Sequence, residues 1–143
     1  MKEEIFMEHL NIIQKSSTCK RVQVAALLVK DDRIIATGKN GVTSGNTHCC
    51  DIFEYADENF SQLHHNFSVR YELHAEQNVI SFCAKHGIAT NNCTLYVSHS
   101  PCIHCAKIIF AAGISSVKYV ERYDRDVSGI DFLIENNIEC IQL

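Results

Sequence analysis

Residues 100–105 read Ser-Pro-Cys-Ile-His-Cys and contain the one proline of the 143-residue chain. Proline is favoured in the first turn of a helix, and serine is favoured as the residue that caps it. The segment therefore predicts a helix capped by Ser100, with Cys102 and Cys105 on one face of its first turn. The N–H groups at a helix N-terminus favour the thiolate form of cysteine, which is the form that binds metal ions.

A CxxC pair supplies half of the ligands of a zinc site, and it also occurs as a redox pair. A thioredoxin-like redox pair would follow the first strand directly, whereas this pair lies late in the chain. On its own, the pair leaves both roles open.

The second half of a zinc site is predicted at His74-Ala75-Glu76, near the start of the preceding helical pattern. Taken singly, His74 is more simply a hydrogen-bonded core histidine and Glu76 an exposed carboxylate. One histidine and two cysteines, however, give three ligands and leave a fourth position open, as in catalytic zinc sites. Two thiolates weaken the Lewis acidity of the metal, so a base must help to deprotonate water, and Glu76 lies at the right spacing. H-x-E followed by P-C-x-x-C is the signature of zinc nucleobase deaminases.

Composition narrows the partners and the compartment. The formal charge is −4 and the chain has no run of Lys or Arg, which argues against a nucleic-acid partner. The N-terminus is too polar and acidic for a signal peptide, and no apolar run approaches the roughly 20 residues that cross a bilayer. We therefore expect a cytoplasmic protein without a membrane partner, in which the eight cysteines stay reduced.

The order of predicted elements indicates an α/β fold in a single domain over residues 1–143. Hydrophobic periodicity predicts helices over 3–15, 73–85, 103–112 and 130–135. Short apolar runs predict strands over 22–29, 34–36, 94–97, 117–120 and 138–141, the first two joined by an acidic turn. Such an order predicts a mixed sheet with helices on both faces. Residues 40–70 have no clear period and are expected to be irregular, which in a compact domain is typical of functional or disordered segments.

The chain resembles the deoxycytidylate deaminase branch of the cytidine deaminase superfamily, and its bacteriophage members in particular. The matching segments are 17–21, 24–30, 36–41, 74–78, 94–97, 100–107 and 112–114. The resemblance implies a three-layer α/β/α cytidine deaminase-like fold with a five-stranded mixed sheet. It also implies hydrolytic deamination of dCMP to dUMP, which supplies thymidylate synthesis.

The resemblance assigns roles to individual residues. His74, Cys102 and Cys105 hold the catalytic zinc, and Glu76 transfers protons from the attacking water to N3 of cytosine and to the leaving ammonia. Family members place the residue corresponding to Asn40 close to the nucleotide.

Lys20 and Arg21 match the region that holds the 5′-phosphate. In structural terms they could equally be solvated charges that precede a strand.

A second group of cysteines and histidines has a structural rationale. A long loop without hydrophobic periodicity cannot order itself by burial, but a closed four-ligand zinc site can hold it. The resemblance to phage enzymes implies a second, structural zinc on Cys19, Cys49, His64 and Glu72. His65 or His48 could replace one of the last two ligands, and Cys50 fits poorly because adjacent cysteines rarely reach the same ion. The plainer interpretation is loop thiols and exposed histidines.

Three departures from the family pattern concern its regulation and its first strand. Ala25 stands where the family has glycine, Lys39 where it has an aromatic residue, and Val42-Thr43-Ser44 where it has a nearby proline. The last loop belongs to the region linked to dCTP activation and dTTP inhibition. These effectors and a hexameric homo-oligomer are therefore expectations from the resemblance, with altered effector contacts.

Two other functions remain open at this point. A tRNA adenosine deaminase has the same zinc motif, but it would need basic patches for its RNA stem loop. A non-catalytic, zinc-stabilised binding module would fill the fourth metal position with a protein ligand and would not need Glu76. Free cytidine deaminase fits less well, since its zinc pattern has cysteine in place of His74.

Overall fold

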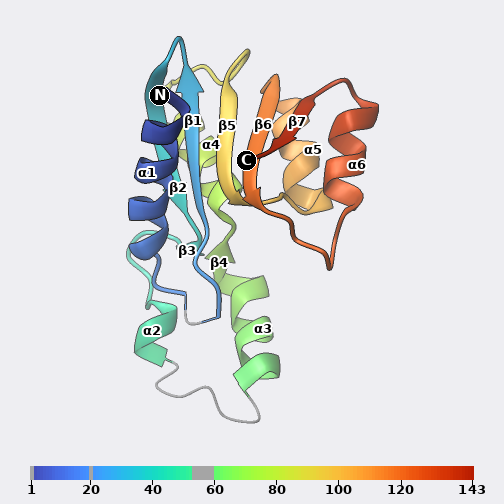
Figure 1. Ribbon diagram of the computed structural model, residues 1–143. Helices are drawn as coiled ribbons and strands as arrows, with labels where there is room; N and C mark the ends of the chain where they lie inside the picture. The colour runs from blue at the N-terminus through green and yellow to red at the C-terminus, as the bar shows by residue number, and fades with distance from the viewer. Residues whose placement is uncertain (1, 20, 53–59) are drawn as a thin grey trace.

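The computed structural model describes residues 2–19, 21–52 and 60–143 (Figure 1). Its main sheet has five strands in the order β2-β1-β5-β6-β7. They are β1 (Ala25–Lys30), β2 (Arg33–Lys39), β5 (Thr94–His99), β6 (Ser116–Glu121) and β7 (Glu139–Gln142). β1 pairs antiparallel with both β2 and β5, whereas β5, β6 and β7 are parallel. The predicted five-stranded mixed sheet is confirmed.

Helices cover both faces of this sheet, as the sequence predicts (Figure 1). On one face lies α1 (Lys2–Lys15); on the other lie α4 (Ala75–His86), α5 (Ile103–Ala111) and α6 (Ser128–Glu135). The alternation of β1 explains the two layers. Leu27 packs with Phe6 and Leu10 of α1, whereas Leu28 packs in the larger core with Val79 of α4 and Ile109 of α5.

The predicted acidic turn joins β1 to β2. Asp31 and Asp32 have positive φ angles of 50° and 61°. Two-residue hairpin turns with this left-handed backbone match the twist of the strands, and Asp tolerates the conformation better than most residues. The hairpin is therefore determined locally.

The prediction that residues 40–70 are irregular was wrong for most of the described residues of that segment, 40–52 and 60–70; residues 53–59 lie outside the described part. The structure has β3 (Gly41–Val42), α2 (Cys49–Ile52) and α3 (Phe60–Tyr71), followed by β4 (Glu72–Leu73), which pairs with β3. Hydrophobic periodicity could not reveal α3, because His64 is its one buried residue. These elements lie together at the lower end of the molecule in Figure 1, below the main sheet.

Two departures from the family pattern are accommodated by ordinary contacts. Ala25 is fully buried in β1, where its methyl group packs in the core below α1. Lys39 ends β2, and its Nζ donates to the carbonyl of Ser16 at 2.9 Å. Among the described residues, no helix combines the length and the apolar character needed to span a membrane.

Gly129 allows α6 to pack against the chain that leads into α5. A Cβ at this position would overlap the carbonyl oxygen of Pro101 and lie 2.7 Å from the carbonyl carbon of Cys102. Both contacts are with backbone atoms, which cannot rotate away as a side chain could. Glycine is therefore required by this close approach.

We expect Gly129→Ala to destabilise the protein, although alanine normally favours a helix over glycine. Overpacking against backbone should lower the free energy of unfolding by about 1–3 kcal/mol. Chemical denaturation measures the change, with Asp131→Ala on the exposed side of α6 as the control. Equal or greater stability of Gly129→Ala would contradict the packing described.

Candidate metal centre and active site

The N-termini of α4 and α5 meet through the side chains of their capping residues. His74 is the N-cap of α4 and Cys102 is the N-cap of α5. His74 Nδ1 lies 3.7 Å from Cys102 Sγ and 3.3 Å from Cys105 Sγ. All three candidate ligand atoms lie within 4.8 Å of one another. The structure thus brings together the histidine and both cysteines singled out from the sequence.

This donor set fits zinc. Zinc bonds of about 2.0 Å to nitrogen and 2.3 Å to sulfur, in a tetrahedron, separate the ligand atoms by roughly 3.3–3.8 Å. The nitrogen-to-sulfur distances of 3.3 and 3.7 Å fall in this range. Among the described residues, the group contains three ligand atoms and no fourth from the protein.

The predicted helix cap at Ser100 was wrong. α5 begins at Ile103, so Cys102 occupies the capping position itself. The N–H of Ile103 donates to Asp126 Oδ2 at 3.0 Å, a carboxylate from the segment between β6 and α6. Ser100 instead accepts the N–H of Tyr123 on its Oγ, at 2.7 Å. A distant carboxylate thus replaces the local cap.

The two thiols have opposite acidities. A hydrogen bond with Cys105, opposed by burial and helped by His74, lowers the pKa of Cys102 to about 4. The same hydrogen bond, together with burial, raises the pKa of Cys105. The hydrogen bond to Cys102 in turn raises the pKa of His74. A cation bound here would favour loss of the remaining protons, because the ligating forms are the thiolate and the neutral imidazole.

Glu76 lies beside this group in the first turn of α4, and its side chain is buried. Burial raises the pKa of its carboxyl group, while contacts with its own backbone N–H, His74 and the Cys105 thiol lower that pKa in part. A carboxyl group with a raised pKa accepts a proton more readily at neutral pH than an exposed one. Glu76 is therefore suited to proton transfer.

A cavity of about 350 Å³ reaches both Cys/His groups. Its volume lies within the range typical of small-molecule sites. It is lined by His74, Glu76 and Cys102 from the first group and by Cys19, His64 and Glu72 from the second. Both groups therefore border one space.

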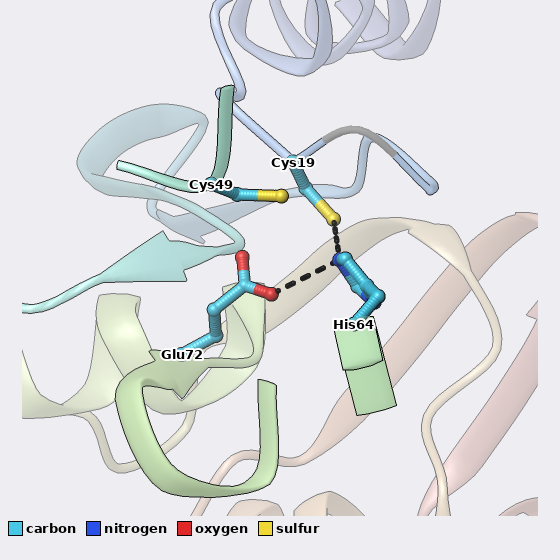
Figure 2. A group of neighbouring side chains, drawn as sticks. All are labelled: Cys19, Cys49, His64 and Glu72. Atoms are coloured by element: carbon cyan, nitrogen blue, oxygen red, sulfur yellow. Dashed lines mark hydrogen bonds and ion pairs between the residues drawn. The ribbon is translucent and has the colours of Figure 1, made fainter. Parts of the chain in front are cut away.

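The second group is formed by Cys19, Cys49, His64 and Glu72, whose side chains point toward one another (Figure 2). One candidate ligand atom from each lies within 4.8 Å of the others. Cys19 Sγ and Glu72 Oε1 both lie 3.4 Å from His64 Nε2. Four separate segments supply them: the chain after α1, then α2, α3 and β4. The structure thus brings these four residues together as well.

Burial of Glu72 indicates that this second group can hold a cation. Its side chain is 3% exposed, and neither carboxylate oxygen accepts a hydrogen bond from the residues that the structure describes. Apart from the 3.4 Å contact of Oε1 with His64 Nε2, burial leaves this carboxylate poorly compensated, and desolvating one ion costs several kcal/mol. Two thiols, an imidazole and a carboxylate are also ligands that zinc accepts.

The alternative ligands lie outside both groups. His48 is exposed, with Nδ1 3.4 Å from the Thr18 hydroxyl, and His65 is exposed on α3. Cys50 points toward the carboxylate of Asp51, at 3.9 Å. Of the adjacent cysteines, Cys49 therefore belongs to the group and Cys50 does not.

Asn40 lines the cavity, but its amide group mainly braces the surrounding loop. Its Oδ1 accepts the N–H of Val24 at 2.9 Å and the hydroxyl of Ser17 at 2.6 Å. Its Nδ2 donates to the carbonyl of Val22 at 2.7 Å. Both acceptor positions and one of two donor positions are thus used within the protein.

Of the two residues predicted to bind the 5′-phosphate, the structure describes one. Arg21 is exposed and lines the cavity. Lys20 lies outside the described residues.

The lining residues that sequence analysis missed include His99, Tyr123 and Arg125. His99 directly precedes the Ser100-Pro101 pair, so its position was an available signal. Its Nε2 lies 3.2 Å from Glu121 Oε2. Tyr123 and Arg125 follow β6, and no spacing in the sequence links them to the metal motif.

A His/Cys/Cys group and a buried carboxylate at two helix N-termini are the donor set and the base expected of a zinc-dependent hydrolytic site. The model of the family described as "Cytidine and deoxycytidylate deaminase zinc-binding region" matches residues 1–121. The chain belongs to this family, and zinc is therefore its metal.

Two curated relatives illustrate the range of the family. Deoxycytidylate deaminase of Enterobacteria phage T4 is 31% identical over 167 aligned positions, which cover 95% of this chain and 86% of that protein. ComE operon protein 2 of Bacillus subtilis is 39% identical over 84% of this chain. The chain spans 59% of the length of that second relative.

A solved structure agrees with the fold over nearly the whole chain. The dCMP deaminase of cyanophage S-TIM5, in complex with dCMP and dUMP, matches with a TM-score of 0.81 and 34% identity. The match covers 99% of this chain and 96% of that one. The predicted three-layer fold is thereby confirmed.

Proposed function

We propose that this chain catalyses the hydrolytic deamination of dCMP to dUMP. The observation that supports it most directly is the buried carboxyl group of Glu76 beside the His74/Cys102/Cys105 group, in a cavity of nucleotide size. A binding module would not need a buried carboxyl group there. Relatives named deoxycytidylate deaminase and the cyanophage complex with dCMP and dUMP support this substrate.

His74, Cys102 and Cys105 would hold the catalytic zinc. When bound, zinc supplies the Lewis acidity that lowers the pKa of a water molecule. The low pKa of Cys102 favours its thiolate form, and the position of His74 as a helix cap fixes its ring beside both sulfurs.

Glu76 would move the protons of the reaction. Its carboxylate takes one proton from the attacking water and delivers it to N3 of cytosine, while the water oxygen forms a bond to C4. The same carboxylate carries the second proton of that water to the exocyclic amine, the C4–N bond breaks, and ammonia leaves. Water and dCMP thus give dUMP and ammonia, and Glu76 ends as it began.

The group of Cys19, Cys49, His64 and Glu72 would hold a second, structural zinc. This ion would tie α2, α3 and the chain after α1 to β4, which leads directly into His74. Because α3 buries little beyond His64, hydrophobic packing alone gives this region limited support. The closed set of four ligands suits a structural role.

The remaining expectations extend from the same proposal. Control by dCTP and dTTP and assembly into a homo-hexamer stay predictions from the family resemblance, and a cytoplasmic location stays a prediction from the sequence. A single domain over residues 1–143 and a contact of Asn40, Lys20 or Arg21 with the nucleotide also stay predictions.

The reaction is tested by incubating the purified protein with dCMP, CMP, deoxycytidine, dCTP and an adenosine-bearing RNA hairpin. We expect ammonia release to be fastest with dCMP. Glu76→Gln should abolish release and retain zinc, since the amide preserves shape but cannot accept the proton. Glu135→Gln, on the exposed side of α6, is the control. Full activity of Glu76→Gln would overturn the mechanism. Ammonia release from the RNA hairpin alone would show that the substrate is RNA and not dCMP.

The second zinc is tested by elemental analysis of wild type, Cys49→Ser and Cys50→Ser. Wild type and Cys50→Ser should contain close to two zinc per chain. Cys49→Ser should contain close to one and should unfold at a lower temperature. The adjacent positions make the two variants a matched pair. One zinc in the wild type, unchanged in Cys49→Ser, would exclude the second site.

A further inference from the structure

The charges that line the cavity differ in exposure. Of the described lining residues, two carry carboxylates, Glu72 and Glu76, and both side chains are buried. Two carry guanidinium groups, Arg21 and Arg125, and both are exposed. The negative charges therefore lie at the buried end of the cavity and the positive charges at its opening to solvent.

This distribution determines how a nucleotide can enter. The cytosine must reach Glu76 for the proposed reaction, so the base occupies the buried end. A phosphate dianion beside buried carboxylates or thiolates would face like charges at low dielectric. The phosphate must therefore lie at the opening, where guanidinium groups can form short, charge-assisted and bidentate hydrogen bonds.

Hydrogen bonds of the residues before and after Arg125 hold its backbone at this opening. Before it, the N–H of Tyr123 donates to Ser100 Oγ at 2.7 Å; after it, Asp126 Oδ2 accepts the N–H of Ile103 at 3.0 Å. Ser100 lies in the segment that leads into α5, and Ile103 begins that helix, next to the metal group. The backbone that carries Arg125 is thus fixed relative to the reacting centre, which lowers the entropy lost on binding.

The neighbouring Arg122 differs in each respect. Its side chain is 54% exposed, its Nε lies 3.6 Å from Asp124 Oδ1, and it does not line the cavity. A pair this exposed contributes little to stability. Arg122 thus has the same charge, three residues away, without access to the site.

We propose that Arg125 binds the 5′-phosphate of the substrate and makes the enzyme prefer the nucleotide to the nucleoside. This inference rests on the proposed deamination of dCMP. Arg125 lies in the segment after β6, whereas Arg21 lies before β1. The amide of Asn40 is largely engaged by the segment between α1 and β1, which leaves the phosphate to such cationic groups.

The test compares Arg125→Gln with Arg122→Gln. For each variant and the wild type, kcat/KM is measured with dCMP and with deoxycytidine, and the inhibition constant of inorganic phosphate is measured against dCMP. Arg125→Gln should lose about 10- to 100-fold in kcat/KM for dCMP, as expected for hydrogen bonds to a charged group, mostly through KM. Its kcat/KM for deoxycytidine and its Tm should stay unchanged. Arg122→Gln should match the wild type throughout.

Phosphate inhibition and the Arg125→Lys variant distinguish phosphate binding from a structural role of Arg125. Inorganic phosphate should inhibit Arg125→Gln more weakly than wild type, and Arg125→Lys should recover part of the dCMP activity. Equal effects of Arg125→Gln and Arg122→Gln on dCMP would overturn the inference. An equal loss with dCMP and deoxycytidine would also overturn it, because the role would then be structural. Absence of dCMP deamination by the wild type would instead reject the proposed function on which the inference rests.

Discussion

The contact between the N-termini of α4 and α5 is the constraint on which the rest of the site depends. A histidine and a cysteine in capping positions place their ligand atoms beyond the helix ends, where neither helix backbone obstructs them. This geometry also explains why His74 and Glu76, two residues apart, can serve one site. The first lies at the end of the helix and the second in its first turn, buried against the thiols. Gly129 and Asp126 then fix the chain before α5 from the direction of α6.

Much of the fold follows from local patterns. The helices of the main layers have regular apolar spacing, and the strands are short apolar runs, so their positions were predicted within a few residues. The segment 40–70 was not, because α3 is a polar helix whose one buried side chain, His64, is a candidate metal ligand. Sequence periodicity detects hydrophobic burial, so it does not detect a helix whose buried contacts are made by polar side chains.

The candidate site was predictable to the extent that its residues form short motifs. His74, Glu76, Cys102 and Cys105 stand at spacings that a helix N-terminus explains. Ser100 was misassigned as a cap, because the carboxylate that caps α5 comes from a segment 23 residues farther along the chain. The place of Arg125 in the cavity lining could not be predicted for the same reason, since only the tertiary fold brings the segment after β6 to the cavity.

Both Cys/His groups adjoin one cavity, and β4 connects them: Glu72 belongs to the second group, and His74 caps the helix that follows. The proposed reaction requires zinc at the first group, with one coordination position left for water. Anomalous diffraction at the zinc edge from crystals of the protein measures this directly. We expect a peak about 2.0–2.3 Å from His74 Nδ1 and both sulfurs, with a non-protein fourth ligand. A fourth protein ligand on that ion, or no peak at the His74 group, would contradict it.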